Sequence, residues 1–418
     1  MLILYSLALL VVLLVGAPFW LFRMAASGRY REGLGERLGL IPERLRAQDA
    51  RPVVWVHAVS VGEVLAASRL IEQLGARAEG PRIVVSTTTR TGQRLARERF
   101  GAERVFYFPL DFAFAVRAWL RALRPKMLLL LETEFWPRML VECHRAGIQV
   151  SVVNARISDR SWPRYLRLRF LWKRLLGGTA LVLAQSVLDA ERLEAIGAKN
   201  VHVSGNLKYD IRVAKPAAVT EVLRRHIGDA KLLVCGSTLE GEEEMLLDAI
   251  PVDCIVVLAP RHPERFEAVA QLLEKKGVRW VRRSEWMLAP ELLEPGMVFL
   301  LDSIGELASV YSLASLAFVG GSLVAAGGHN PLEPAQFGVP VVIGPHYENF
   351  RAIVEKLREV DGIRIFNTQD LPAGLAALFA DADAGLAMGE RARAVFLSEA
   401  GATDRAVAAL LHLLEIRA

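Results

Sequence analysis

A glycine-rich segment at residues 320–334 carries the clearest chemical pattern in the sequence. It reads Gly-Gly-Ser-Leu-Val-Ala-Ala-Gly-Gly-His-Asn-Pro-Leu-Glu-Pro, between an expected strand (Leu316–Val319) and an expected helix (Leu332–Phe337). Gly327 and Gly328 let a ligand approach the backbone, and the amides at a helix start favour a phosphate. Glu333 offers two acceptor oxygens to the hydroxyls of a ribose. Taken alone, the segment is equally consistent with a loop that only caps a helix.

The first expected strand ends in a segment with two titratable side chains. It reads His57-Ala58-Val59-Ser60-Val61-Gly62-Glu63, and a helix is expected from Val64. A glutamate there either stabilises the positive end of the helix dipole or acts as a general base toward an acceptor hydroxyl. The sequence leaves both roles open for Glu63. We expect His57 to be a hydrogen-bonded structural residue.

Two more carboxylates follow the strand expected at Met127–Leu131. Glu132 and Glu134 are separated by one residue, and carboxylates at a strand end can stabilise positive charge in a transition state. One of the two is expected only to cap the helix that begins near Pro137. Arg156 closes the next strand, where it either contacts an anionic acceptor or forms a structural ion pair.

The second half of the chain supplies cations and amide donors at similar positions. Arg261 follows an apolar strand and suits a nucleotide phosphate or a base carbonyl, whereas Arg265, on the next helix, is expected at the surface. Residues 305–307 open a helix after another strand and can offer amides to a phosphate. Ser237 and Glu240 match a capping box at the start of an acidic helix.

Apolar runs that alternate with amphipathic segments position these residues. In the first half the expected strands are Val53–Val56, Ile83–Ser86, Val105–Phe108, Met127–Leu131, Val150–Val153 and Leu181–Ala184. In the second half they are Leu232–Cys235, Ile255–Leu258, Val298–Leu301, Leu316–Val319 and Val339–Ile343. This alternation predicts an α/β protein with two Rossmann-like domains, each with a parallel sheet that binds ligands at the carboxyl ends of its strands. If the domains face each other, both sets of loops line one cleft.

Length and composition agree with two domains. A chain of 418 residues exceeds one ordinary core, and 53% hydrophobic with 23% charged residues is typical of a globular protein. We expect an anchor at residues 1–22, an N-terminal acceptor-binding domain at 23–205, a linker at 206–216 and a C-terminal nucleotide-sugar-binding domain at 217–418. The three cysteines, Cys143, Cys235 and Cys254, are expected to be buried thiols in a reducing compartment.

Charge is distributed unevenly along the chain. Residues 1–209 carry 31 Lys+Arg against 17 Asp+Glu, and subtraction from the totals of 51 and 46 leaves 20 against 29 for residues 210–418. The balances are therefore +14 and −9. A basic half predicts an anionic partner, which by charge alone is either nucleic acid or an anionic membrane surface.

The N-terminal segment favours the membrane and argues against nucleic acid. Residues 2–22 contain no charged side chain and approach the length of a spanning helix, and no basic residue precedes the apolar run as in a cleavable signal peptide. Gly16 and Pro18 also allow a shallow insertion at the interface. Four arginines follow, so the positive-inside tendency places the catalytic body on the cytoplasmic face of an inner membrane: Arg23, Arg29, Arg31 and Arg37.

Residues 161–176 interleave basic and aromatic side chains. This pattern fits a basic amphipathic helix at a membrane interface, or a domain helix whose aromatic residues pack inward. The Asp381-Ala382-Asp383 sequence matches a metal-binding pattern of sugar transferases but lies between alanine-rich helices, so we expect a surface turn. No cluster has metal-ligand spacing and no P-loop is present, so neither a metal nor another cofactor is expected.

Six motifs, in this order, resemble one family. They are Val59–Glu63, Glu132–Pro137, Asn154–Ser158, Gly205–Asp210, Pro260–Arg265 and Gly320–Pro334. The chain is similar to the 3-deoxy-D-manno-octulosonic acid (Kdo) transferases of lipopolysaccharide biosynthesis, from the apolar start to about Asn349. The resemblance implies a GT-B fold and metal-independent, inverting transfer of Kdo from CMP-Kdo to the lipid A precursor (lipid IVA) at the cytoplasmic face of the inner membrane.

The resemblance also implies roles for individual residues. Glu63 matches the general base, and Lys208 with Glu132 or Glu134 matches the residues that stabilise the transition state. Ser60, Gly62 and Arg156 are the acceptor-side positions. The positions matched to CMP-Kdo are Pro260, Arg261, Gly305, Glu306, Leu307, Gly328, Asn330, Pro331, Leu332, Glu333 and Asn349.

Two other classes of protein share some of these features. The first class is another nucleotide-sugar enzyme of the same fold, such as a UDP-sugar transferase or an epimerase. The apolar start and the basic segment argue against a soluble epimerase. A membrane-tethered protein that binds a nucleotide without catalysis is the other. Retention of Glu63, Lys208 and Glu333 together argues against this second class.

Overall fold

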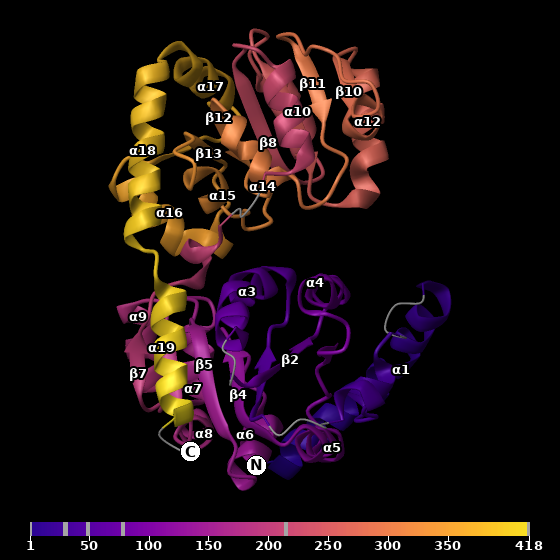
Figure 1. Cartoon of the computed structure of the whole chain (residues 1–418), viewed down its shortest axis with the longest axis vertical. Helices are drawn as coiled ribbons and strands as arrows, with labels where there is room; N and C mark the ends of the chain where they lie inside the picture. The colour runs from indigo at the N-terminus through magenta and orange to yellow at the C-terminus, as the bar shows by residue number, and fades with distance from the viewer. Residues whose placement is uncertain (1, 28–31, 47–50, 77–79, 213–215, 416–418) are drawn as a thin grey trace. The chain divides into compact units, whose positions relative to one another are not determined.

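The computed structural model describes residues 2–27, 32–46, 51–76, 80–212 and 216–415 (Figure 1). Contacts divide the chain into unit 1, Met1–Ile211 with Ala400–Ala418, and unit 2, Arg212–Glu399. Each unit contains one seven-stranded parallel sheet, so the predicted α/β class with two parallel sheets is confirmed. Residues 400–418, which we expected to belong to the C-terminal domain, group with unit 1.

The two sheets have related strand orders. Unit 1 follows β3-β2-β1-β4-β5-β6-β7, with β1 Val53–His57, β2 Arg82–Thr87, β3 Val105–Tyr107, β4 Pro125–Leu131, β5 Gln149–Ala155, β6 Leu181–Ala184 and β7 Val201–Val203. Unit 2 follows β10-β11-β9-β8-β12-β13-β14, with β8 Leu232–Thr238, β9 Ile255–Pro260, β10 Arg279–Arg282, β11 Met297–Leu300, β12 Leu316–Val319, β13 Val341–Ile343 and β14 Ile363–Ile365. In each sheet the strand order reverses beside a central strand, where doubly wound folds bind their ligands.

Helices connect the strands within each unit. Those of unit 1 are α1 Leu2–Ser27, α2 Leu34–Arg37, α3 Val61–Gly75, α4 Arg90–Phe100, α5 Ala113–Leu123, α6 Pro137–Arg145, α7 Trp162–Arg167, α8 Arg169–Leu176, α9 Val187–Ala195 and α19 Ala402–Glu415. Those of unit 2 are α10 Ala218–His226, α11 Glu242–Ala249, α12 Phe266–Lys275, α13 Arg283–Trp286, α14 Leu307–Val310, α15 Leu332–Ala335, α16 Arg351–Glu359, α17 Leu371–Ala380 and α18 Ala382–Ser398.

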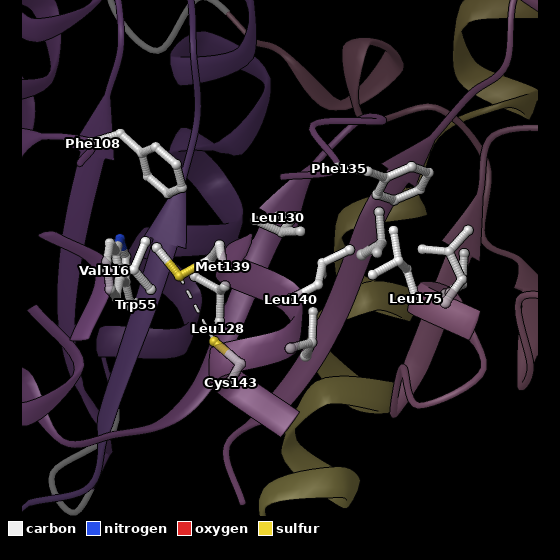
Figure 2. Packing of buried hydrophobic residues seen from close by; sticks show 14 of the residues in the cluster. Trp55, Phe108, Val116, Leu128, Leu130, Phe135, Met139, Leu140, Cys143 and Leu175 are labelled. Atoms are coloured by element: carbon white, nitrogen blue, oxygen red, sulfur yellow. Dashed lines mark hydrogen bonds between the residues drawn. The ribbon is translucent and has the colours of Figure 1, made fainter. Parts of the chain in front are cut away.

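Alternating side chains along each strand divide the core of unit 1 into two layers. On β1, Trp55 belongs to one buried cluster, while Val54 and Val56 belong to the other. Figure 2 shows the first cluster, in which residues of α5, α6 and α8 pack around Leu128 and Leu130 of β4. The second cluster joins α3, α4 and α19. Both faces of the sheet are therefore covered, as parallel sheets require.

All eleven strands expected from the sequence are present. Most extend one to three residues further than the apolar runs that predicted them. Three further strands, β7, β10 and β14, were missed, and each lies at an edge of its sheet. Edge strands are short and partly exposed, so they lack the continuous apolar run that marks a central strand.

The N-terminal helix α1 exposes an apolar surface. Its exposed side chains are Leu4, Leu7, Leu10, Val11, Val12, Leu14, Val15 and Phe19, while the hydroxyl of Tyr5 donates to Asp111 Oδ2 at 2.9 Å. Among the described residues no single helix is both long and apolar enough to cross a membrane; α1 qualifies only as the shorter stretch Leu4–Phe19. The bent pair Leu371–Ala380 with Ala382–Leu414 passes the same test together. The expected helix is confirmed, and its role as an anchor stays a prediction.

The basic and aromatic segment forms two short helices, α7 and α8. Three of its rings, Trp162, Tyr165 and Trp172, pack against the core of unit 1, as the domain-helix interpretation predicts. Phe170 is instead exposed, among exposed arginines on the same two helices. The segment therefore anchors itself through three aromatic residues and leaves a basic surface with one large apolar side chain.

Candidate active site

The carboxylate of Glu63 is held at the first turn of α3. The helix begins at Val61, three residues before the expected start, and Ser60 is its N-cap residue. The backbone N–H of Val59 donates to Glu63 Oε2 at 2.8 Å, and the hydroxyl of Ser60 donates to Oε1 at 2.9 Å. Burial, and to a smaller extent the negative charge of Glu132, raise the pKa of Glu63 to about 7. Such a pKa suits a general base near neutral pH.

Glu132 lies in a backbone conformation that side chains rarely adopt. Its φ is +55°, in the left-handed region, directly after β4 ends. Its N–H donates to the carbonyl of Val153 at 2.9 Å, which fixes the turn to the neighbouring strand. Burial and the adjacent Glu132 both raise the pKa of Glu134. Strained backbone next to a carboxylate pair is frequent at functional sites.

Lys208 completes a charged cluster within unit 1. It lies on a short 3-10 helix, η2 (Leu207–Asp210), and its Nζ is 4.0 Å from Glu132 Oε1. Burial lowers the pKa of Lys208. The negative charges of Glu132 and Glu63 oppose this shift, and the positive charge of Arg156 adds to it. Glu63, Glu132, Arg156 and Lys208 therefore interact at the carboxyl ends of the strands, although they come from distant parts of the sequence.

A network of amide side chains holds the turn that carries Lys208. Asn154, with φ +59°, accepts a hydrogen bond from Leu207 N through Oδ1 at 3.0 Å. Asn206 Oδ1 accepts from Lys208 N at 3.0 Å, and Asn206 Nδ2 donates to Gln185 Oε1 at 3.0 Å. We had not foreseen this role for Asn154, although it stands in one of the motifs.

The last helix of the chain also supports this turn. Buried Asp210 accepts hydrogen bonds from Gly401 N at 2.6 Å and Thr403 N at 2.5 Å, and so caps α19. Arg405 donates through Nε to the carbonyl of Ser204 at 2.8 Å. These contacts explain why residues 400–418 group with unit 1. No local signal announces them, because the partners are about two hundred residues apart.

His57 is a structural residue, as expected. Its side chain is fully buried, Nδ1 lies 3.0 Å from the hydroxyl of Ser86, and the ring stacks on Phe108 with centroids 3.8 Å apart. Burial lowers the pKa of His57 to about 3, so the ring is neutral at physiological pH. Cys143, Cys235 and Cys254 are also buried and free, as predicted.

In unit 2 the glycine-rich segment forms the loop that was expected. Gly327 and Gly328 have φ of +87° and +75°, and a Cβ at Gly327 would lie 2.5 Å from the side chain of Asn349. Asn349 N donates to the carbonyl of Gly327 at 2.9 Å. This residue, predicted to bind CMP-Kdo, therefore packs against the glycine-rich loop. Helix α15 ends at Ala335, two residues short of the expected end. A single turn has a weak dipole, so the loop amides matter more for an anion.

Three titratable side chains gather beside this loop. Burial, and to a smaller extent the positive charge of Arg261, lower the pKa of His329 to about 4. Burial raises the pKa of Glu333 to about 7, and Arg261 opposes that shift. Arg261 follows buried Pro260 at the end of β9 and is exposed. An exposed guanidinium beside a half-buried carboxylate can bind an anion and hydroxyl groups together.

The turn at residues 305–307 has the predicted position. Gly305 has φ +90°, Glu306 is the N-cap residue, and Leu307 begins α14. The carboxylate of Glu306 contacts Arg283 at 2.6 Å and accepts from the hydroxyl of Ser303. The predicted donor residues therefore all lie in unit 2, whereas the predicted catalytic residues all lie in unit 1.

Two predictions around α11 are wrong. Ser237 and Glu240 do not form a capping box, because Gly241 is the N-cap residue and the carboxylate that reaches back is Glu242. Arg265 is not a surface residue: its side chain is 19% exposed and makes two hydrogen bonds to buried Glu243, at 2.5 and 3.1 Å. In the second case a buried acid far along the chain draws the arginine inward, which periodicity alone does not reveal.

The Asp381–Asp383 segment is at the surface, as predicted, but it is not a separate turn, because α18 begins at Ala382 and includes Asp383. Asp381 is the N-cap residue of α18, and its Oδ1 accepts a hydrogen bond from Ala384 N at 3.0 Å. Both aspartates are exposed. Asp381 is thus accounted for by helix capping, and Asp383 by the preference for an acidic residue in the first turn of a helix.

Solved structures with a similar arrangement of two parallel α/β sheets are of the GT-B type. The structure resembles UDP-GlcNAc 2-epimerase from Neisseria meningitidis bound to UDP-GlcNAc, with a TM-score of 0.56 and 14% identity, over 86% of this chain and 100% of that chain. At this identity the likeness establishes the fold and carries no information about the reaction.

Sequence similarity identifies the family. Residues 32–211 match the family described as 3-Deoxy-D-manno-octulosonic-acid transferase (kdotransferase). The 3-deoxy-D-manno-octulosonic acid transferase of Haemophilus influenzae is 34% identical over 409 residues, 93% of each chain, and that of Bordetella pertussis is 34% identical over 414 residues, 94% of each chain. The chain belongs to the 3-deoxy-D-manno-octulosonic acid transferase family, and is thus a glycosyltransferase of lipopolysaccharide biosynthesis. The resemblance seen in the sequence is confirmed.

Proposed function

We propose that this protein transfers Kdo from CMP-Kdo to the lipid A precursor, lipid IVA, by an inverting displacement that needs no metal. The observation that carries the proposal is the cluster in unit 1, where Glu63 has a pKa of about 7 beside Glu132 and Lys208. Family membership supports the transferred sugar. The donor nucleotide, the acceptor and the stereochemistry are part of the proposal.

Glu63 is the general base of the proposed reaction. Its ionised carboxylate takes the proton of the acceptor hydroxyl as the hydroxyl oxygen forms a bond to the anomeric carbon of Kdo. The bond between that carbon and the phosphate oxygen breaks, and CMP leaves as a phosphate monoester. Hydrogen bonds from Val59 N and Ser60 hold the carboxylate in one orientation. Ser60, exposed Gly62 and Arg156 border the place where the acceptor would bind.

Lys208 and the neighbouring carboxylates supply the electrostatic part of catalysis. The anomeric centre gains positive character as the leaving group departs, and negative charge grows on the phosphate oxygen. Glu132 and Glu134 stabilise the first, and Lys208 stabilises the second. Burial of the lysine strengthens this effect, because charges interact more strongly where water is excluded.

Unit 2 binds the donor in this proposal. Arg261 contacts the phosphate or the cytosine carbonyl, and Glu333 accepts hydrogen bonds from the ribose hydroxyls. The amides of residues 305–307 and 328–332 add donors along the nucleotide. Support comes from Arg261, whose charge acts on both His329 and Glu333.

We further propose that unit 1 rests on the cytoplasmic face of the inner membrane. The apolar side chains exposed on α1 and the basic surface of α7 and α8 support this location. A lipid acceptor would then meet Glu63 without leaving the membrane surface.

One assay tests the proposal directly. The purified protein is incubated with CMP-Kdo and tetraacylated lipid A precursor in detergent with EDTA present, and the lipid is analysed by mass spectrometry. A mass increase of one or more Kdo units would support donor, acceptor and metal independence together. No change, beside an active control transferase, would overturn the proposal and favour another nucleotide-sugar reaction.

A further inference from the structure

Glu242, at the start of α11, is a buried carboxylate surrounded by backbone amides. Its side chain is fully buried. Oε2 accepts from Leu239 N at 2.8 Å and from Gly321 N at 2.6 Å, and Oε1 accepts from Ser322 N at 2.9 Å and Leu323 N at 2.8 Å. Four amide donors satisfy a carboxylate completely. Among the described residues, Glu242 has no ion pair with Lys or Arg, so these amides are its recorded hydrogen-bond partners.

Three of the four amides belong to the beginning of the glycine-rich loop. Residues 321–323 lie one residue after the end of β12, and their N–H groups all donate to one side chain. Hydrogen bonds with an ionised acceptor are short and strong in a buried setting. Gly320 and Gly321 have little backbone preference of their own, because glycine adopts many conformations. The carboxylate of Glu242 therefore fixes the direction in which the chain leaves the sheet.

The fixed segment determines the position of the far side of the loop. Gly328 N donates to the carbonyl of Gly321 at 2.7 Å, and His329 N donates to the carbonyl of Gly320 at 3.1 Å. The residues proposed to bind CMP, Asn330–Glu333, follow immediately. A displacement of residues 320–323 would therefore be passed on to His329 and Glu333 through two backbone hydrogen bonds.

The segment is also closely packed against β8 and Glu242. A Cβ added at Gly320 would lie 2.6 Å from the carbonyl oxygen of Ser237 and 2.9 Å from Glu242 Oε2. Buried Ser322 donates through its hydroxyl to the carbonyl of Val319 at 2.6 Å and accepts from Gly344 N at 2.8 Å. The loop is thus fastened to β12 and to the segment after β13.

We propose that Glu242 is a positioning residue of the donor site, which organises the 320–333 loop for binding of the cytidine nucleotide without touching it. The inference rests on the proposed function, because it assumes that this loop binds CMP-Kdo. Glu242→Gln tests it, since the amide group cannot accept hydrogen bonds at both of its ends and would place an NH2 group against N–H donors.

The substitution should weaken affinity for the nucleotide and have a smaller effect on the rate of the chemical step. Loss of two hydrogen bonds to a charged acceptor should raise the dissociation constant for CMP about tenfold or more and raise the KM for CMP-Kdo similarly, while kcat changes less. Binding is measured by calorimetry with CMP as the probe. Glu244→Gln, on the same helix and 59% exposed, is the matched control and should bind like the natural protein.

Hydrogen exchange separates positioning from general destabilisation. In Glu242→Gln, amides of residues 320–329 should exchange faster while those of β8 and β9 keep their protection; uniform loss of protection, or unchanged CMP affinity in the folded variant, would overturn the inference. If Glu242→Gln does not fold, Glu242→Asp provides a second test, because its carboxylate is one methylene shorter and its hydrogen bonds to residues 321–323 would lengthen; it should weaken CMP binding in the same way. Absence of CMP binding by the natural protein would instead overturn the proposed donor. Hydrogen exchange at residues 320–329 would still test whether Glu242 holds the loop in place.

Discussion

The ammonium group of Lys208 lies 4.0 Å from Oε1 of Glu132, and the backbone of Glu132 is held at φ +55°. Glu132 in turn raises the pKa of Glu63, so the three side chains form one electrostatic unit. A change at any one of them should therefore alter the behaviour of the others. This coupling gives the first prediction.

We expect kcat/KM for Kdo transfer to rise with pH through about 7, because Glu63 must be ionised to accept a proton and its pKa is about 7. Glu132→Gln removes the negative charge that raises this pKa, so the rising limb should move to lower pH. The measurement is the pH profile of kcat/KM for both proteins. Glu98→Gln, an exposed acid on α4, is the control. A rising limb that stays in place in Glu132→Gln would contradict the coupling.

Glu63→Gln should abolish transfer without unfolding the protein. Folding raises the pKa of Glu63 from 4.5 to about 7, so ionising this buried group opposes folding, and its unfavourable contribution develops as pH rises from about 4.5 to 7. Glutamine removes that cost, so the free energy of unfolding should increase above pH 7 by about 1 kcal/mol, after allowance for lost hydrogen bonds. Chemical denaturation at pH 5 and pH 8 checks this. A loss of stability at pH 8 would argue against the raised pKa.

Lys208→Met should lower kcat by about a hundredfold or more, which is the usual cost of removing one preorganised electrostatic contact. Because a buried charge is replaced by an apolar chain of similar length, the stability of unit 1 should change little. Steady-state kinetics with thermal unfolding of both proteins provides the measurement. Lys199→Met, at an exposed position before β7, should have normal kinetics. Normal turnover in Lys208→Met would remove the lysine from the mechanism.

Arg261 and Arg265 are four residues apart, and their substitutions should have opposite consequences. Arg261→Ala should weaken CMP binding about tenfold with little effect on stability, because the side chain is exposed and faces the proposed donor site. Arg265→Ala leaves the buried carboxylate of Glu243 without its cation and should destabilise the protein by roughly 3 kcal/mol. Calorimetry with CMP and denaturant unfolding distinguish the two. Equal effects of both variants on CMP affinity would contradict this division.

The membrane proposal predicts that charged substitutions on α1 release the protein from lipid. Val12→Asp with Val15→Asp removes two of the exposed apolar side chains, each worth roughly 2 kcal/mol of burial, so sedimentation with anionic phospholipid vesicles should fall more than tenfold. Leu386→Asp with Leu397→Asp, on exposed positions of α18, is the control pair. Undiminished sedimentation of the α1 variant would show that another surface binds the membrane.

Central strands were predictable from the sequence because their burial on both faces requires an uninterrupted apolar run. The runs at Val53–Val56 and Leu316–Val319 are examples, and both became buried strands. The edge strand β10 contains two arginines and an exposed start, so its pairing depends on the neighbouring strand β11. Such a strand has no local pattern to find.

Most candidate site residues were also found from the sequence, since ligands of parallel sheets bind where the strands end. Glu63, Glu132, Arg156 and Arg261 were identified in this way. Neither the raised pKa of Glu63 nor the lowered pKa of Lys208 could be predicted, because both depend on burial and on charges contributed by other strands.

The sequence alone determined the order of the eleven expected strands, the family, and which segments carry chemical groups, because these depend on side-chain periodicity and on motifs read locally. Only the tertiary structure decided which of those groups interact. Asp210 caps a helix that begins at Ala402, and Glu242 binds the amides of residues 321–323. In both cases a buried carboxylate requires amide donors. The tertiary structure supplies them from a helix N-terminus or a loop that is distant in the sequence.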